Sequence, residues 1–148
     1  MAVTRNIAAR ASGDEVIDAF EDVAKIAGDD PVAAFRRCRA QFLEATDRPG
    51  ALRTPVASRV GDMTIDSYMG FMRSDTFVHT WDIASGAAIE PHFDPQMVSL
   101  ILTDYLERDM TTLRVPQRYD AERSVTGNAG ELARLIAFTG RDPDWRAN

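Results

Sequence analysis

The sequence predicts an all-α protein, a bundle of amphipathic helices, from three observations. Apolar side chains recur at three- and four-residue steps along much of the chain, which is the spacing of one helix face. Asp-Pro pairs at 30–31 and 94–95 are helix-start signals, because aspartate caps the first turn and proline suits its first position. With 148 residues, 45% of them hydrophobic, the chain suits one domain, 1–148, with its own core.

The first half of the chain predicts three helices and a short extended segment. Residues 1–11 and 14–26 are expected to be helical, separated by a break at 12–14. A third helix begins at Pro31 and runs to about Thr46, where 48–50 (Arg-Pro-Gly) stops it. Its apolar positions are Phe35, Cys38, Phe42 and Leu43. Over 51–64, alternating residues and a turn at Gly61-Asp62 favour a small hairpin or an extended crossover.

The second half predicts three more helices. The first covers 65–85 and ends at Gly86. The second begins after Asp94, and its apolar face comprises Val98, Ile101, Leu102, Tyr105 and Leu106. A loop over 111–127 leads to a short helix, 131–138, that Gly140 closes. We expect Trp145, in the tail, to dock back on the body of the protein.

Asp75 and His79, one turn apart on the 65–85 helix, are the best chemical clue in the sequence. They fall on the face that Ile65, Tyr68, Met69, Met72, Thr76 and Ile83 define. A carboxylate on a core-facing side is costly unless it is paired, and a divalent ion bound by both side chains would pair it. Zinc, nickel, iron and manganese all accept such ligands. The alternative is a polar pair in which Asp75 accepts a hydrogen bond from His79.

Two further side chains extend this hypothesis. Asp82, one turn after His79, would fix the imidazole tautomer from behind; its alternative is a solvated carboxylate near the helix end. His92, in the loop before the next helix, is the only other histidine and the only other candidate imidazole ligand. A surface histidine is the more common interpretation of such a position.

Charge and composition exclude several classes of function. The net charge of −6 argues against nonspecific binding to nucleic acid or to an anionic membrane. No apolar run is long enough to span a bilayer, and no signal peptide is recognisable. The single cysteine, Cys38, fits a reducing cytoplasm. Arginines at 36, 37 and 39 would favour a reactive thiolate, whereas an inert buried thiol is the common alternative.

Three segments carry a resemblance to a known family. Residues 77–84 (FVHTWDIA) resemble a signature of actinobacterial proteins in the DinB/YfiT-like superfamily, which includes the mycothiol-dependent maleylpyruvate isomerases. Residues 133–145 (ARLIAFTGRDPDW) and 28–35 (GDDPVAAF) resemble an uncharacterised metal-binding branch of that superfamily. The resemblance therefore runs along nearly the whole chain, and it is specific for the family and not for a substrate.

The resemblance implies a four-helix bundle with a divalent metal held by three side chains. Two of them map onto Asp75 and His79; the third is a family histidine that would lie upstream of Met1, so the bundle is expected to be N-terminally shortened. The implied function is a transferase or isomerase that uses a low-molecular-weight thiol such as mycothiol on a small-molecule substrate. The alternative is a non-catalytic helical module. With two ligands we expect weak metal binding.

The missing helix also predicts an assembly. The faces bearing Phe35, Phe42, Met69, Met72, Ile101 and Tyr105 would lack one neighbour. An exposed apolar groove of that kind is unusual on a monomer, so we expect a homodimer.

Overall fold

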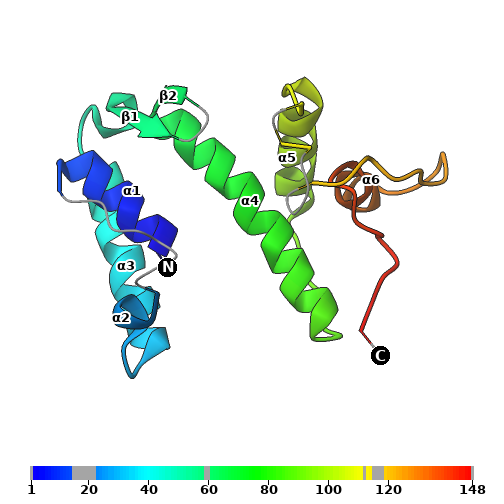
Figure 1. Ribbon diagram of the computed structural model, residues 1–148, viewed down its shortest axis with the longest axis horizontal. Helices are drawn as coiled ribbons and strands as arrows, with labels where there is room; N and C mark the ends of the chain where they lie inside the picture. Colours follow the sequence, from blue (N-terminus) through cyan, green and yellow to red (C-terminus); the bar gives the residue numbers. More distant parts are fainter. Residues whose placement is uncertain (1, 15–22, 59–60, 112, 115–118, 148) are drawn as a thin grey trace. The chain divides into compact units, whose positions relative to one another are not determined.

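The computed structural model describes residues 2–14, 23–58, 61–111, 113–114 and 119–147 (Figure 1). These residues form six α-helices, one 3-10 turn and one two-stranded antiparallel sheet. The predicted helical class and the predicted hairpin are therefore confirmed, and the four-helix bundle stays a prediction. Contacts divide the chain into two compact units, Met1–Arg73 and Ser74–Asn148. Within the described ranges, no helix is both long and apolar enough to cross a membrane.

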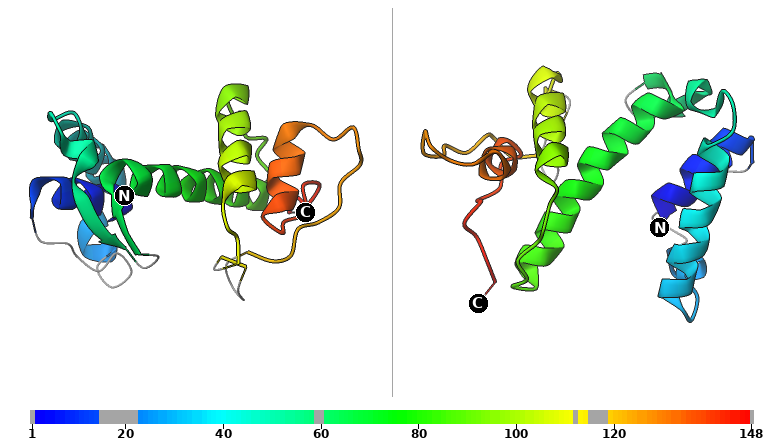
Figure 2. Two further views of the ribbon diagram at one scale, coloured as in Figure 1. Left: turned by 90° about the horizontal axis from the view of Figure 1, so that it is seen from above. Right: turned by 180° about the vertical axis from the view of Figure 1, so that it is seen from behind.

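The first unit contains α1 (Ala2–Ser12), α2 (Val23–Ala27), α3 (Pro31–Thr46), η1 (Ala51–Arg53), β1 (Pro55–Ser58), β2 (Gly61–Thr64) and the start of α4 (Ile65–Gly86). α1 lies along α3, and α2 packs against α3 (Figures 1 and 2). The predicted α3 start is confirmed, because Asp30 Oδ1 accepts a hydrogen bond of 2.9 Å from the Ala33 N–H. Residues 15–22 and Val60, which figured in the predicted second helix and hairpin, lie outside the described residues.

The core of the first unit forms where α1, the sheet and α4 meet. Ile7, Val56 and Ile65 are buried together, and Phe42, Met69 and Met72 are among the partly buried side chains that pack on them. Strand register pairs Pro55 with Thr64 and Ser58 with Gly61. The predicted turn at Gly61-Asp62 is therefore wrong, because both residues pair within β2. On α3, Phe35 and Leu43 are exposed while Cys38 is buried, so only part of the predicted apolar face is covered.

The second unit contains the rest of α4, α5 (Pro95–Glu107) and α6 (Glu131–Phe138). α5 begins as predicted, with Asp94 Oδ1 accepting a hydrogen bond of 2.8 Å from the Gln96 N–H. α5 packs against α6, and the described part of 111–127 contains neither helix nor strand. Of the predicted apolar face of α5, four positions are buried and Leu106 is exposed.

Packing in the second unit covers two of the side chains that were predicted to line an exposed apolar groove. Ile101 and Tyr105 are 0% and 1% exposed, because α6 and the ring of Tyr119 cover this side of α5. These two residues were predicted to lack a neighbour, and that prediction is wrong. The homodimer itself stays a prediction.

Both helix ends that flank the candidate site use a left-handed residue. At the end of α4 this residue is Ala88, with φ of 53°, and not the predicted Gly86. The Ile89 N–H bonds to the Ala84 carbonyl at 2.8 Å, which is the long bond of a Schellman motif. At the end of α6, Gly140 takes this role as predicted, with φ of 87°.

Candidate functional site

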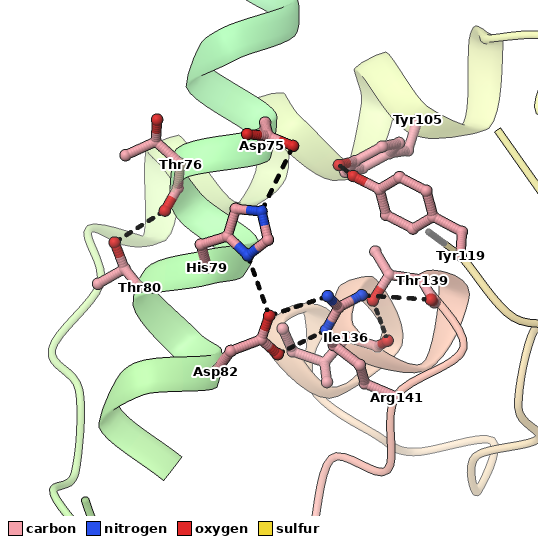
Figure 3. A network of polar contacts seen from close by, with 10 residues as sticks. All are labelled: Asp75, Thr76, His79, Thr80, Asp82, Tyr105, Tyr119, Ile136, Thr139 and Arg141. Atoms are coloured by element: carbon pink, nitrogen blue, oxygen red, sulfur yellow. Dashed lines mark hydrogen bonds and ion pairs between the residues drawn. The ribbon is translucent and has the colours of Figure 1, made fainter. Parts of the chain in front are cut away.

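Asp75, His79 and Asp82 lie along one side of α4 in the second unit (Figure 3). Side-chain exposure is 34% for Asp75, 61% for His79 and 34% for Asp82. The sequence pattern placed Asp75 and His79 on a core-facing side of the helix, which is wrong for His79, because its side chain is exposed. Ile83 and Thr76, assigned to the same apolar face, are also exposed. Buried positions in this part of α4 are Ser74, Phe77, Val78, Trp81 and Ser85.

Segments distant in sequence determine which face of α4 is buried here. The Phe93 ring, in the loop before α5, stacks on Phe77 with centroids 4.1 Å apart. The Ala147 N–H donates a 3.2 Å hydrogen bond to the Ser85 carbonyl. The tail therefore docks through the Ala147 backbone and through the Arg146 side chain, which lies over the Trp81 ring and near Glu90. Trp145, predicted to be the anchor, is 51% exposed. A helical repeat read from α4 alone carries no information about these partners.

The imidazole of His79 lies between two carboxylates (Figure 3). Nε2 is 3.7 Å from Asp75 Oδ1, and Nδ1 is 3.3 Å from Asp82 Oδ2. In the tautomer protonated on Nδ1, the N–H donates to Asp82, and Nε2 presents a lone pair on the side of Asp75. Two ligands of a tetrahedral zinc ion lie roughly 3.3–3.6 Å apart. The observed 3.7 Å between Oδ1 and Nε2 is slightly longer, so the two atoms would have to approach by about 0.1–0.4 Å to share one ion, with Asp82 orienting the ring from behind.

Arg141 holds Asp82 in place through a two-pronged ion pair. Its Nε donates to Oδ1 at 2.6 Å and its Nη2 donates to Oδ2 at 2.9 Å. Burial disfavours the charge on Arg141, but the hydrogen bonds and the negative charge of Asp82 outweigh it and raise the pKa of the guanidinium. Asp82 is therefore held in place as an acceptor facing His79.

The end of α6 positions Arg141. The Arg141 N–H bonds to the Ile136 carbonyl at 3.3 Å and the Gly140 N–H bonds to the Ala137 carbonyl at 2.9 Å, a Schellman motif with glycine at its left-handed position. A Cβ on Gly140 would lie 2.7 Å from Asp120 Cβ and 2.8 Å from its Cα. Glycine is required here both for the backbone angle and for the close approach of the preceding loop.

A hydrogen-bonded tyrosine pair lies beside Asp75 (Figure 3). The hydroxyls of Tyr105 and Tyr119 are 2.8 Å apart. Burial, with added contributions from Tyr119 and from the negative charge of Asp75, raises the pKa of Tyr105 well above its ordinary value of 10.0. Burial likewise raises the pKa of Tyr119, against an opposing contribution from its hydrogen bond with Tyr105. Both hydroxyls therefore stay protonated near neutral pH.

The predicted ligand set is only partly brought together. Within the described ranges, no three His, Cys, Asp or Glu side chains are grouped so that they could hold a metal ion. His92 is exposed in its loop and does not complete the set. Sequence reasoning missed Arg141 and Tyr119. For Arg141 the usable signal was its place directly after the helix-closing Gly140, whereas Tyr119 gave none.

Comparison of the chain with models of known protein families, with curated proteins and with solved structures finds no match.

Proposed function

We propose that this protein is a metal-dependent transferase or isomerase that uses a low-molecular-weight thiol, with Asp75 and His79 as protein ligands of zinc, nickel or iron. One observation carries the proposal: Asp75 Oδ1 and His79 Nε2 lie 3.7 Å apart while the other ring nitrogen faces a clamped carboxylate. The thiol, mycothiol or one like it, and the small-molecule substrate come from the sequence resemblance alone.

Each residue of the site has a defined task in this proposal. Arg141 fixes Asp82, and Asp82 keeps the proton of His79 on Nδ1 so that Nε2 is free to bind. Tyr105 and Tyr119, held neutral by their raised pKa values, supply hydroxyl groups beside Asp75. A bound divalent ion would lower the pKa of a coordinated thiol or water. With two protein ligands, most coordination positions stay open for water, thiol or substrate.

A non-catalytic helical module is the second candidate. It is favoured by the polar contacts themselves, since His79 can be satisfied by Asp75 and Asp82 without an ion. It is also favoured by the lack of a three-ligand group among the residues described. In this alternative the three side chains form a surface ion-pair network.

Zinc titration of matched variants tests the ligand assignment. We expect micromolar or weaker binding in the natural sequence, because two ligands supply only part of the roughly 10–16 kcal/mol of a structural zinc site. Asp75→Asn and His79→Ala should abolish it. Asp66→Asn, in the exposed first turn of α4, and His92→Ala should leave it unchanged. Equal affinity in all four variants would remove the proposed site.

The cobalt-loaded protein separates the two candidate functions. If a thiol enters the coordination sphere, its addition should produce an intense thiolate-to-cobalt absorption in the near ultraviolet, absent in His79→Ala. Cobalt binding with no response to added thiol would favour the non-catalytic module. Turnover of an electrophilic substrate that requires both metal and thiol would establish the enzyme.

The proposed homodimer now depends on apolar side chains that α3 exposes. Val32, Phe35 and Leu43 are 60%, 50% and 46% exposed. Light scattering at micromolar concentration tests it: a dimer that Phe35→Ser weakens is expected, and a monomer at all concentrations contradicts it.

A further inference from the structure

A pocket in the first unit brings cationic side chains of three helices together. Its volume is about 320 Å³, and it is lined by Arg5 of α1, Lys25 and Ile26 of α2, and Ala34, Arg37, Cys38 and Gln41 of α3. We propose that this pocket binds a small organic anion that carries carboxylate or phosphate groups. The site is separate from Asp75 and His79, and its proposal does not depend on theirs.

The pocket is lined by positive side chains, although the chain as a whole is negatively charged. The protein as a whole carries a net charge of −6, yet the lining contains two arginines and a lysine and, within the described residues, no carboxylate. Neither Arg5 nor Arg37 forms an ion pair with a described carboxylate. Arg5 and Arg37 therefore bring positive charge to the pocket that a bound anion would compensate.

The floor and the rim of the pocket indicate the ligand class. Ala34 and Cys38, 1% and 5% exposed, give an apolar floor. Arginine at the rim offers paired N–H donors that match the two oxygens of a carboxylate or phosphate. The volume lies at the lower end of the roughly 300–1,000 Å³ typical of small-molecule sites. A short carbon skeleton with one or two anionic groups fits all three features.

Isothermal titration with two probes, succinate and inorganic pyrophosphate, tests the proposal and separates carboxylate from phosphate ligands. We expect saturable binding of at least one probe, weakened about tenfold or more in Arg37→Gln and in Arg5→Gln. Arg37→Lys should weaken it less, since the charge remains and the paired donors are lost. The matched controls are Arg36→Gln and Arg39→Gln, because these neighbours are exposed on α3 and do not line the pocket.

Cys38 supplies an independent readout at the pocket floor, because it is the only cysteine of the chain. The bound probe should slow alkylation of Cys38 in the natural sequence and in Arg36→Gln, but not in Arg37→Gln. Circular dichroism confirms that each variant is folded. The proposal is overturned if neither probe binds at millimolar concentration, if Arg36→Gln weakens binding as much as Arg37→Gln, or if saturating probe leaves Cys38 alkylation unchanged.

Discussion

Removing the ion pair between Asp82 and Arg141 should destabilise the second unit measurably. The pair makes two hydrogen bonds, of 2.6 and 2.9 Å, between side chains that are 34% and 21% exposed. A hydrogen bond to a charged group contributes about 1.5–3 kcal/mol when it is shielded from water, and an exposed ion pair contributes at most about 1. Because Asp82 is one-third exposed, we expect a coupling free energy of about 1.5–2 kcal/mol.

A double-mutant cycle measures this coupling free energy directly. The variants are Asp82→Asn, Arg141→Gln and the two combined, unfolded in urea. Both tryptophans, Trp81 and Trp145, belong to the second unit, so tryptophan fluorescence reports its unfolding alone.

The exposed ion pair between Arg123 and Asp142 provides a control double-mutant cycle. Its atoms lie 3.7 Å apart and its side chains are 55% and 49% exposed, so its coupling should be below about 0.5 kcal/mol. A coupling between Asp82 and Arg141 no larger than that of this pair would refute the clamp. The His79 tautomer, read by nitrogen NMR, should shift away from Nδ1–H in Asp82→Asn and stay unchanged in Asp142→Asn.

Three further predictions follow from the backbone and the tyrosine pair. Gly140→Ala should cost about 2–4 kcal/mol, from a left-handed backbone and a close contact, while Gly127→Ala, with open space around it, should be near neutral in the same urea assay. Ala88→Gly should stabilise the protein by about 1 kcal/mol, because glycine relieves the left-handed strain; a loss of stability would contradict the helix end described. Folding raises the pKa of Tyr105 and Tyr119, so their contribution to the free energy of unfolding is complete below about pH 10 and declines above it. Urea midpoints measured from pH 8 to 11 should show this decline, and a flat profile would contradict it.

Local chemistry explains which elements the sequence could predict. The starts of α3 and α5 depend on an aspartate at the N-cap and a proline in the first turn. Both helices begin where this pattern predicted. Gly140 likewise acts within its own turn, at the end of α6. The end of α4 lies at Gly86, within one residue of the prediction, but the left-handed residue that closes it is Ala88, which the preference for glycine at such positions could not reveal.

Which face of α4 is buried could not be predicted from its own sequence, because the segments that cover it lie elsewhere in the chain. The spacing of Ile65, Met69 and Met72 marks a face that packs in the first unit. In the second unit the covered face is chosen by Phe93 and by the backbone of Ala147. The pairing of Asp82 with Arg141 spans 59 residues of sequence and connects two helix ends, which periodicity within either helix cannot reveal.

The candidate site depends on a chain of contacts that begins at a glycine. Gly140 lets the backbone turn so that Arg141 faces α4, Arg141 fixes both oxygens of Asp82, and Asp82 faces Nδ1 of His79. In the proposed metal site these contacts would orient His79 from behind, and such orientation commonly changes metal affinity about 10–100-fold. Arg141→Gln should therefore weaken zinc binding by about that factor while leaving Asp75 and His79 in place, whereas in the non-catalytic alternative it would change stability alone.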